Sequence, residues 1–271
     1  MKTLRETLES VANQNHSDIE HLVVDGGSTD GSLKILEDFP SISWTSGPDD
    51  GHYHAMNKGI VQATGEVVAV LNADDCYATG ALAAVSRAFE SNPTWDALIG
   101  GIIYVDGEGQ EIFRRREAVW DPQVVRFGFA LNHQILFVRK SVYERLGTYR
   151  YREFKNACDY DFYMRLATRG AIVGTLQTYL VRYRFHAFGQ SADRRVATNM
   201  DRECREIRRQ YGVPGGFLGG LLRIYARVKR QVQKLIILRT IDWIPGRVYL
   251  RRHMRDRTSF SSNVGVDHLE P

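Results

Sequence analysis

Carboxylate side chains follow apolar runs at two places in the first third of the chain. Asp25 closes the run "IEHLVVD", and Asp74 and Asp75 close the run "EVVAVLNADD". Two adjacent carboxylates repel each other and are costly to desolvate together unless a cation lies between them. Mg²⁺ and Mn²⁺ take oxygen ligands of this kind and complete their coordination with water and phosphate oxygens. The pair indicates either a divalent-metal site or a solvated turn before the next helix, and the residues alone leave both interpretations open.

These carboxylates need a frame that holds strand ends together, and the first 190 residues alternate between strand-like and helix-like segments. Apolar runs predict strands over 19–24, 66–72 and 97–106, and helical spacing of apolar residues predicts helices over 1–14, 32–39, 53–64 and 81–92. This alternation predicts an α/β fold with a single, Rossmann-like, mostly parallel sheet and helices on both faces. Ligands of such sheets lie beyond the carboxyl ends of the strands, which is where Asp25, Asp74 and Asp75 stand.

The composition of the 271 residues is that of a folded, water-soluble protein, with 43% hydrophobic and 25% charged residues. The amino-terminal stretch has the spacing of an amphipathic helix rather than of a secretory signal, so we expect a cytoplasmic protein. Three cysteines, at positions 76, 158 and 204, are too few and too scattered for a disulfide framework or a zinc site. A glycine-rich fingerprint that follows a strand and opens a helix is missing, which excludes a nicotinamide-dependent oxidoreductase.

Positive charge is concentrated near the carboxyl end. The formal net charge is +4, yet residues 218–257 hold 11 basic and two acidic side chains, or +9, which leaves −5 for the rest of the chain. Helical spacing from residue 218 onward places apolar residues on one face of a helix and basic residues on the opposite face. The apolar set is Leu218, Leu221, Leu222, Tyr225, Val228, Val232, Leu235 and Ile236, and the basic set is Arg223, Arg227, Arg230 and Lys234.

No stretch of this segment approaches the ~20 uncharged apolar residues of a membrane span. A basic amphipathic helix suits an anionic membrane surface, so we expect peripheral binding to the inner face of a membrane. The alternative is a helix packed on the body of the protein with its basic face in solvent. No nucleic-acid-binding module is recognised, and no nucleic acid is expected as a partner. The predicted organisation is a domain over 1–212, a basic helical extension over 213–257 and a disordered tail over 258–271.

Four stretches resemble, in order, motifs of the family 2 glycosyltransferases, which have the GT-A fold: "VVDGGSTDGS", "SGPDDGHYHAMNKGI", "GEVVAVLNADD" and "ACDYDFYMRL". The resemblance runs from about residue 3 to residue 191. It implies an enzyme that moves a sugar from a nucleotide-sugar donor, most often a UDP-sugar, to a hydroxyl of a glycan or lipid-linked acceptor. It also implies Mg²⁺ or Mn²⁺ as cofactor, inversion of the anomeric centre, and a role in polysaccharide or cell-surface glycan synthesis.

The resemblance assigns residues to a nucleotide-sugar pocket. Asp25 is expected to accept a hydrogen bond from the base, and Asp49 to form the second wall of the pocket. Lys58, in the "MNKG" step, is expected to face the pocket, with a solvated surface lysine as the alternative. The full set expected at the nucleotide sugar is Asp25, Gly27, Ser28, Asp49, Asn57, Lys58 and Asp74.

The metal site is assigned in the same way. Asp75 is expected to be the direct metal ligand, and Asp74 to contact the ribose or the metal. Asn72 stands where many relatives have aspartate, so the leading position of the motif is not expected to bind metal. His186 lies just before "FGQS" and is expected to contact a phosphate or the metal, although Phe188 replaces one of the family's usual glycines there.

Transfer to a hydroxyl needs a base that takes its proton. The resemblance gives this role to Asp159, which opens the helix in "ACDYDFYMRL"; a simple helix cap is the alternative, because a carboxylate is favoured at that end of a helix. Asp161 is the alternative base, and Cys158 stands where many relatives have glutamate. His133 and Gln134 enter an apolar strand that is similar to the family's acceptor side, although a core histidine would fit the same pattern.

The resemblance lacks one feature, because family members normally begin with a strand and a "T–x–N" or "Y–N" loop before the helix seen here at Thr3. We therefore expect an amino-terminally truncated sequence, whose sheet lacks its central first strand and has unpaired backbone groups and a cavity in its place. The rival hypothesis is a catalytically impaired binding or scaffold protein that keeps the fold. A phosphohydrolase with carboxylate-bound magnesium also fits "NADD" taken alone.

Overall fold

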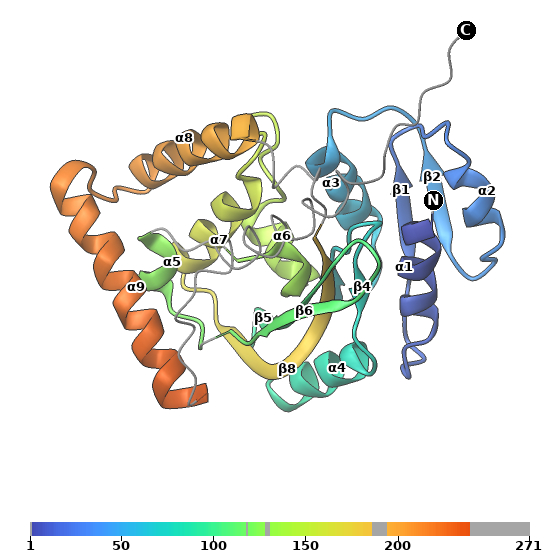
Figure 1. The fold of residues 1–271 in the computed structure, drawn as a ribbon, viewed down its shortest axis with the longest axis horizontal. Helices are drawn as coiled ribbons and strands as arrows, with labels where there is room; N and C mark the ends of the chain where they lie inside the picture. Colours follow the sequence, from blue (N-terminus) through green and yellow to red (C-terminus); the bar gives the residue numbers. More distant parts are fainter. Residues whose placement is uncertain (1, 118, 128–130, 186–193, 239–271) are drawn as a thin grey trace, which may run out of the picture.

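The computed structural model of this chain describes residues 2–117, 119–127, 131–185 and 194–238. Its described elements form two sheets with helices around them, with the amino-terminal elements at one end and α8 and α9 at the other (Figure 1). The predicted α/β class is confirmed. Two sheets stand where a single sheet was predicted, because the strand over 22–25 does not pair with the strand over 67–69.

The larger sheet has six strands in the described part of the chain. Their order is β3 (Val67–Ala69), β7 (Leu136–Arg139), β5 (Ala97–Val105), β8 (Val173–Arg184) and β4 (Cys76–Tyr77), with β6 (Glu111–Arg115) paired to β5. Only β5 and β8 pair in parallel among them, so the prediction of a mostly parallel sheet is wrong. One cause is a tight turn after β5, where the Asp106 carboxylate accepts hydrogen bonds from the backbone N–H groups of Glu108 and Gln110 and sends the chain straight back as β6.

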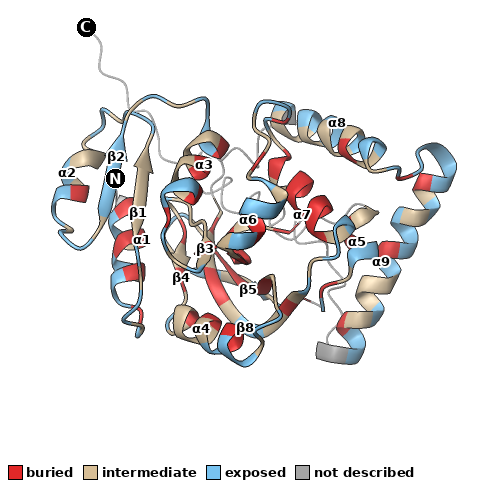
Figure 2. Ribbon diagram, turned by 180° about the vertical axis from the view of Figure 1, so that it is seen from behind, coloured by how far each residue is buried: buried red, intermediate tan, exposed pale blue. Residues whose placement is uncertain are grey.

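The centre of the large sheet is β5, which is buried along its whole length. Leu98 and Ile102 join an apolar cluster with α4 (Ala81–Ser91), while Ala97 and Ile99 join a second cluster with α7 (Cys158–Thr168). Buried residues accordingly gather around β5 and in α7 (Figure 2). Gly100 permits close packing of β5 on β8, since a Cβ atom there would lie 2.3 Å from the side chain of Leu180.

The smaller sheet consists of β1 (Leu22–Asp25) and β2 (Ser43–Ser46), which pair in parallel. Two helices, α1 (Lys2–Ala12) and α2 (Ser32–Glu37), pack with it around Leu4, Leu8 and Leu36, a cluster separate from those of the large sheet. The predicted apolar face of α1 is confirmed, because Leu4, Leu8 and Val11 are all buried. A third helix, α3 (His52–Gln62), packs on β1 and places Met56 and Ile60 in the core of the large sheet.

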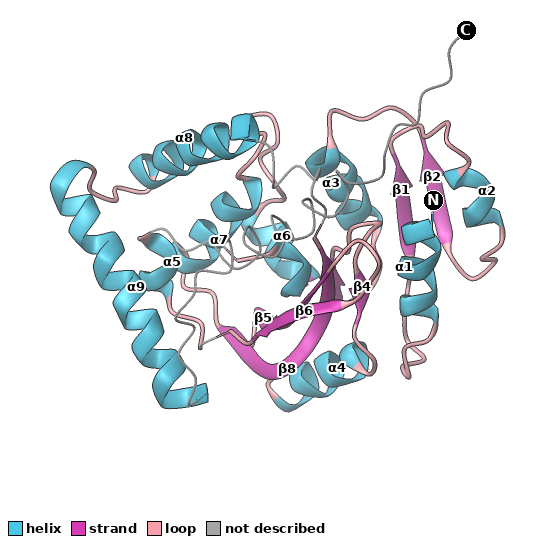
Figure 3. Ribbon diagram, in the orientation of Figure 1, coloured by secondary structure: helices cyan, strands magenta, loops and turns pink. Residues whose placement is uncertain are grey.

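The remaining helices lie on the side of the large sheet that is away from β1 and β2 (Figure 3). They are α5 (Pro122–Arg126), the short 3₁₀ helix η1 (His133–Ile135), α6 (Lys140–Leu146), α8 (Arg194–Gln210) and α9 (Gly216–Leu238). No helix in the described residues is long and apolar enough to cross a membrane. The predicted boundary at residue 212 falls between α8 and α9, and the separate status of the extension stays a prediction. The predicted tail over 258–271 lies outside the described residues.

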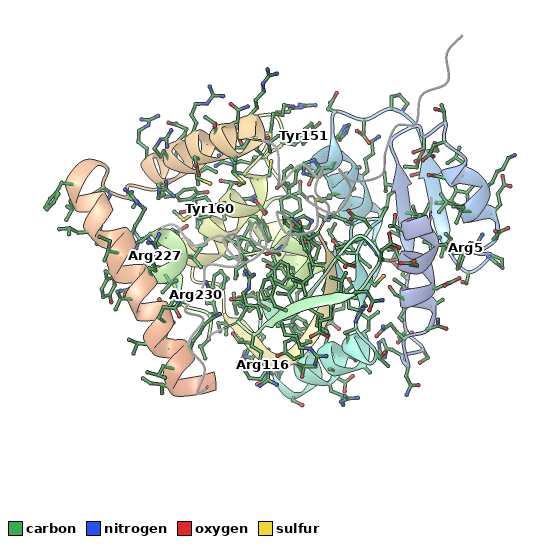
Figure 4. All side chains as sticks on the ribbon, in the orientation of Figure 1. Arg5, Arg116, Tyr151, Tyr160, Arg227 and Arg230 are labelled. Carbon is green, nitrogen blue, oxygen red and sulfur yellow. The ribbon has the colours of Figure 1, made fainter. Side chains whose placement is uncertain are left out.

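α9 packs on the body of the protein, but with the opposite face from the one expected. The sequence alternative placed its basic face in solvent. Arg230 pairs with the buried Glu117 and faces the body of the protein (Figure 4). Lys234 is 1% exposed and also faces inward. Lys229 Nζ lies 2.7 Å from Asp121 Oδ2 on the same side. The apolar residues face outward and are 47–84% exposed: Phe217, Leu218, Leu221, Ile224, Tyr225, Val228, Val232, Leu235 and Ile236.

Candidate active site

Asp25 organises the turn after β1. Its Oδ2 atom accepts hydrogen bonds from the backbone N–H groups of Gly27 and Ser28, both at 2.9 Å, and from the hydroxyl of Ser46 at 2.6 Å. Partial burial opposes ionisation of this carboxyl, but the hydrogen bonds outweigh it and lower the pKa of Asp25 to about 2. Asp25 is therefore an ionised carboxylate at the carboxyl end of a strand, with one oxygen held by the turn. Its contact with a nucleotide base stays a prediction.

Asp49 lies directly against the turn that Asp25 organises. A Cβ atom at Gly26 would come within 2.8 Å of Asp49 Oδ2, so glycine is needed there for the two segments to approach. Lys58 on α3 donates from Nζ to the carbonyl oxygen of Pro48 at 3.0 Å and so ties α3 to the same loop. The two predicted walls of the nucleotide pocket are thus side by side.

Asn57 lies on α3 but is buried away from this edge. Its side-chain NH₂ donates to the carbonyl oxygen of Tyr149 at 2.8 Å, and its side-chain oxygen accepts from the backbone N–H of Tyr149 at 2.9 Å. These two hydrogen bonds join α3 to the loop that precedes α7, and they occupy the side-chain amide of Asn57. The structure therefore gives Asn57 a structural role in place of the predicted contact with the nucleotide sugar.

Asp75 is the completely buried member of the carboxylate pair. Its Oδ1 accepts from the backbone N–H of Arg184 at 2.8 Å, and its Oδ2 accepts from Gln134 Nε2 at 2.9 Å. Burial, and then the negative charge of Asp74, raise the pKa of Asp75 to about 7. A carboxylate enclosed in this way cannot face a ligand, so the prediction that Asp75 is the direct metal ligand is wrong. Asp74 is half-buried and is the member of the pair that remains accessible.

Gln134 supports Asp75, so its predicted place on the acceptor side is also wrong: its side chain is 2% exposed and turned inward. Arg184 closes the same cluster from the end of β8. Its guanidinium donates to the carbonyl oxygens of Asp74 (3.1 Å) and Gly107 (2.9 Å) and pairs with Glu6 on α1. Sequence reasoning missed Arg184, because a basic residue at a strand end carries no local sign of a buried partner.

His133 connects the loop after β3 to the start of α7. Its Nε2 lies 3.2 Å from Asn72 Oδ1, and its Nδ1 lies 4.0 Å from Asp159 Oδ2. The side chains of His133 and Asp159 keep 12% and 19% exposure, so both reach the surface of the site. The predicted base and the predicted metal loop are therefore separated by a single imidazole ring.

The two candidate bases on α7 have different surroundings. Asp161 is fully buried and binds three partners: Arg150, Arg165 Nε at 3.1 Å and the Tyr211 hydroxyl at 3.2 Å. It is a structural anchor, and the alternative that Asp161 is the base is wrong. Asp159 Oδ1 accepts from the backbone N–H of Tyr160 at 2.8 Å, while Oδ2 faces His133. Asp159 therefore accepts one backbone hydrogen bond in the first turn of α7 and presents its other carboxylate oxygen to the site.

Two residues at the start of α3 also belong to this cluster. Desolvation and the nearby His133 lower the pKa of His52, while Asp159 and Asp49 act in the opposite direction. Burial, and then the charge of Asp159, raise the pKa of the Tyr53 hydroxyl. Sequence reasoning treated this stretch only as a helix, although a histidine that directly follows "PDDG" at a helix start was a signal that could have been used.

The residues around Asp74 fit a Mg²⁺ or Mn²⁺ site that phosphate and water complete better than a site whose ligands all come from the protein. Among the described residues, no group of three or more His, Cys, Asp or Glu could hold a metal ion. Mg²⁺ and Mn²⁺ need no such group, because one or two carboxylates with phosphate oxygens and water suffice. Asp74 offers one such carboxylate. His186, the other predicted metal contact, lies outside the described residues.

The fold is shared with solved structures of glycosyltransferases. TarS 1–349 from S. aureus, in complex with UDP-GlcNAc, aligns with a TM-score of 0.56 and 18% identity over 98% of this chain and 73% of that chain. The mannosyltransferase PcManGT from Pyrobaculum calidifontis, in complex with GDP-Man and Mn²⁺, aligns with a TM-score of 0.58 and 17% identity over 85% of this chain and 66% of that chain. At this level of identity the likeness establishes the fold, which is the GT-A fold of glycosyltransferases.

Comparison with protein families gives the assignment within that class. The model of glycosyl transferase family 2 matches residues 1–160. A PGL/p-HBAD biosynthesis glycosyltransferase of Mycobacterium bovis is 31% identical over 188 residues, which are 67% of this chain and 71% of that protein. The O-antigen biosynthesis protein RfbC of Myxococcus xanthus is 29% identical over 182 residues, or 63% of this chain and 14% of that protein. The chain belongs to glycosyl transferase family 2 and is a glycosyltransferase, as the resemblance predicted.

Proposed function

We propose that this glycosyltransferase moves a sugar from a UDP-sugar to a hydroxyl group of a glycan or lipid-linked acceptor, with Mg²⁺ or Mn²⁺ as cofactor. The observation that carries the proposal is the contact of His133 with both Asn72, in the loop after β3, and Asp159, at the start of α7. This contact brings a base candidate to the loop that holds Asp74. The nucleotide sugars in the two neighbouring structures, UDP-GlcNAc and GDP-Man, support a nucleotide-sugar donor.

The donor would lie along the edge formed by Asp25, Asp49 and Asp74. Asp74 would hold the cation, because Asp75 is enclosed behind it. When bound, the metal supplies Lewis-acid stabilisation of the negative charge that develops on the departing diphosphate. The proximity of Asp49 to the turn that follows Asp25 supports a pocket for the nucleotide base between these two residues.

Asp159 would act as the general base. It would take the proton of the acceptor hydroxyl while the hydroxyl oxygen bonds to the anomeric carbon and the bond to the nucleotide breaks. Attack opposite the departing diphosphate inverts the anomeric centre. Asp159 lies in the first turn of α7. His133, which also contacts Asn72, would hold the carboxylate of Asp159 in its orientation.

The exposed face of α9 supports an acceptor at a membrane. Its outward apolar residues form one stripe, and Arg223 and Arg227 are exposed on the same helix. An apolar stripe beside basic residues is typical of helices that lie in the headgroup region of anionic bilayers. We propose that α9 holds the enzyme on the cytoplasmic face of a membrane, where a lipid-linked acceptor in polysaccharide or cell-surface glycan synthesis would be presented. The names of the relatives in PGL/p-HBAD and O-antigen biosynthesis agree with such a pathway.

A donor screen with the full chain tests the chemistry. The protein is incubated with UDP-, GDP- and dTDP-sugars and Mn²⁺, and release of free nucleotide is measured with and without a chelator. We expect release from UDP-sugars that the chelator abolishes. Preference for a GDP- or dTDP-sugar would contradict the assignment of the donor, and chelator-resistant release would contradict the assignment of the metal.

Substitution of the base separates binding from turnover. Asp159→Asn is expected to keep the affinity for UDP and to lower turnover by a factor of about 10²–10⁴, the contribution of a general base. Loss of UDP binding in this variant would instead make Asp159 a structural cap.

A second candidate function is nucleotide-sugar binding without turnover. The cavity between β1 and β3 favours it, because among the described residues β1 pairs with β2 alone and the sheet is open beside the proposed nucleotide pocket. Binding of UDP-sugars with no nucleotide release under any condition of the donor screen would support this candidate.

Vesicle binding tests the role of α9. The wild-type chain is expected to co-sediment with vesicles rich in anionic lipid and to be released by salt. The double variant Val228→Glu with Val232→Glu should lose this binding, whereas Val61→Glu, at an exposed apolar residue of α3, should keep it. Equal binding of both variants, or binding to purely zwitterionic vesicles, would contradict the proposal.

A further inference from the structure

The inward face of α9 docks on the segment between β6 and α5 through charged and polar side chains. Arg230 pairs with Glu117, whose side chain is 1% exposed. Lys229 and Gln233 both contact Asp121 Oδ2, at 2.7 Å and 2.9 Å. The docked helix therefore places the guanidinium of Arg230 beside a carboxylate that is buried inside the protein.

Glu117 pairs with one arginine at each of its two carboxylate oxygens. Arg230 donates to Oε2, and Arg115 Nε lies 2.8 Å from Oε1. The contact with Arg115 is an ion pair that lacks the alignment of a hydrogen bond. A guanidinium favours two parallel hydrogen bonds to both oxygens of a carboxylate. Because Arg230 already binds Oε2, Arg115 approaches from the side of Oε1 and turns its Nη2 atom toward Asn132.

The side chain of Asn132 is held by Arg115 and Tyr104. Arg115 Nη2 donates to Asn132 Oδ1 at 3.2 Å, and the Tyr104 hydroxyl donates to the same oxygen at 3.4 Å. Asn132 is the N-cap residue of η1, yet its side chain makes no hydrogen bond to the backbone of that helix. Asparagine at an N-cap ordinarily accepts such a bond. The orientation of this side chain therefore depends on Arg115 and Tyr104 rather than on the helix that it precedes.

Asn132 is joined directly to the candidate site. It precedes His133, whose ring lies between Asn72 Oδ1 at 3.2 Å and Asp159 Oδ2 at 4.0 Å. The carbonyl oxygen of Asn132 accepts a hydrogen bond from the Tyr163 hydroxyl on α7 at 3.2 Å. A displacement of Asn132 would therefore move His133 relative to the helix that carries Asp159.

Tyr163 lies between the charges under α9 and the candidate site. Burial, and then the charge of Asp159, raise the pKa of its hydroxyl. The charge of Glu117 also raises this pKa, and the charge of Arg115 lowers it. Both groups of charges are thus close enough to act on one buried hydroxyl, so they are neighbours within the core.

We propose that Arg115 is a positioning residue for the proposed base, Asp159. Arg115 holds the side chain of Asn132, and Asn132 in turn fixes His133 against the Asp159 carboxylate. This inference rests on the proposed function, in which Asp159 takes the proton of the acceptor hydroxyl.

The docked α9 sets the orientation of Arg115. When α9 leaves the body, Arg230 leaves Oε2 of Glu117, and both carboxylate oxygens become open to Arg115. The guanidinium of Arg115 then rotates to bind both oxygens and releases Asn132. Turnover therefore depends on the inward face of α9 even without a membrane. A membrane on its outward apolar face leaves this contact in place.

Kinetics of variants without vesicles test the proposal. Asn132→Ala and Arg230→Ala are each expected to lower kcat by about 10-fold or more, because the base is misplaced, and to leave KM for the donor unchanged. The double variant should lose no more than the larger single loss, because both changes break the same path. Arg114→Ala, at the exposed neighbour that pairs with Glu111, should keep the wild-type kcat. Normal kcat in Asn132→Ala, or additive losses in the double variant, would overturn the proposal.

Hydrogen exchange checks the order of the path. Amides of α9 should exchange at wild-type rates in Asn132→Ala, which acts after the docking contact, and faster in Arg230→Ala. Faster exchange of α9 in Asn132→Ala would show that Asn132 holds the helix, and it would overturn the assigned order.

NMR of the imidazole needs no turnover and so separates this inference from the proposed function. The ¹⁵N ring signals of His133, assigned by their loss in His133→Gln, should shift in Asn132→Ala and in Arg230→Ala and stay in place in Arg114→Ala. Shifted signals in a chain that transfers no sugar would support the path to His133 and contradict the proposed function. Unshifted signals in both Asn132→Ala and Arg230→Ala would overturn the positioning role of Arg115.

Discussion

At the scale of single residues, two adjacent aspartates have opposite roles. Asp75 is enclosed and accepts hydrogen bonds from Arg184 and Gln134, and burial beside Asp74 raises its pKa to about 7. Asp74 remains half-buried at the open edge. Of the two adjacent aspartates, Asp75 therefore supports the loop, and Asp74 is the candidate metal ligand.

Paired substitutions test this division of roles. Asp74→Asn is expected to weaken Mn²⁺ binding in the presence of UDP by about 10-fold or more, because a carboxylate ligand is lost. Asp75→Asn should retain Mn²⁺ binding, since its amide can accept from the Arg184 N–H and donate to the rotated amide of Gln134, whose Oε1 has no partner among the described residues. Titration calorimetry measures both variants, and unfolding curves show that each is folded. Comparable losses of Mn²⁺ binding in the two variants would restore Asp75 as a ligand.

At the scale of elements, α8 holds the start of α7 in place. Glu203 on α8 accepts hydrogen bonds from the backbone N–H of Asn156 at 2.8 Å and of Ala157 at 3.0 Å, next to Asp159. A carboxylate at the amino end of a helix accepts hydrogen bonds from backbone N–H groups that have no partner within the helix. Its negative charge is also attracted by the positive end of the helix dipole. Glu203 is therefore a positioning residue for the proposed base.

Removal of this cap should act on both stability and turnover. Glu203→Ala is expected to cost about 1–2 kcal/mol of unfolding free energy, as for other helix caps, and to lower kcat more than it raises KM. Glu206→Ala on the same helix is the control, because Glu206 pairs only with exposed neighbours on α8 among the described residues. It should change stability by less than about 0.5 kcal/mol. A normal kcat in Glu203→Ala would remove α8 from the positioning of Asp159.

Attachment of α9 depends on a buried charge cluster. Glu117 is 1% exposed and pairs with Arg115 at 2.8 Å and with Arg230. Burial opposes ionisation of this carboxyl, but the charges of Arg115, Arg230 and Lys234 outweigh it and lower its pKa. The helix is thus held by charge, which leaves its apolar face outward.

Glu117→Gln should release α9. Loss of one partner leaves buried cations uncompensated, at a cost of about 3–5 kcal/mol, and amides of α9 should exchange faster. A lowered carboxyl pKa contributes stability above its ordinary value of 4.5 that is lost as the pH falls below 4.5 through the folded-state pKa. Wild-type α9 should therefore loosen on acidification, and the variant should show less change. Unaltered exchange of α9 in Glu117→Gln, with Glu111→Gln as exposed control, would contradict this anchor.

At the scale of the whole molecule, a cavity of about 1170 Å³ between β1 and β3 separates two apolar units. The cluster around Leu8 and Leu36 is separate from the two clusters of the large sheet. The bond from Glu20 to Thr64, the packing of α3 on β1 and the packing of α1 on β4 join the units. The smaller unit therefore has fewer buried contacts to hold it.

This division predicts unequal local stability. Amides of β1 should exchange by local opening at a lower free energy than amides of β5, which is buried along its whole length. Hydrogen exchange with mass spectrometry measures both in one experiment. Identical opening free energies for β1 and β5 would show that the two sheets unfold as one cooperative unit.

The sequence by itself determined the family, the α/β class and the location of most elements, because these depend on local periodicity and on motifs of contiguous residues. The helices over 2–12, 52–62 and 158–168 and the buried strand over 97–105 were predicted close to their observed bounds. The alternation of strands and helices was also visible, but the direction of each pairing was not, because direction depends on loops such as the turn at Asp106.

Only the tertiary structure decided which side chains of a motif face the site. Adjacent residues point to different sides of the backbone, so the burial of Asp75 and the accessibility of Asp74 depend on partners more than 50 residues away, Gln134 and Arg184. The same reason separates Asp159 from Asp161, whose partners include Tyr211 on the turn after α8. It also explains α9, since helical periodicity identified its two faces, and only the buried Glu117 determined which of them turns inward.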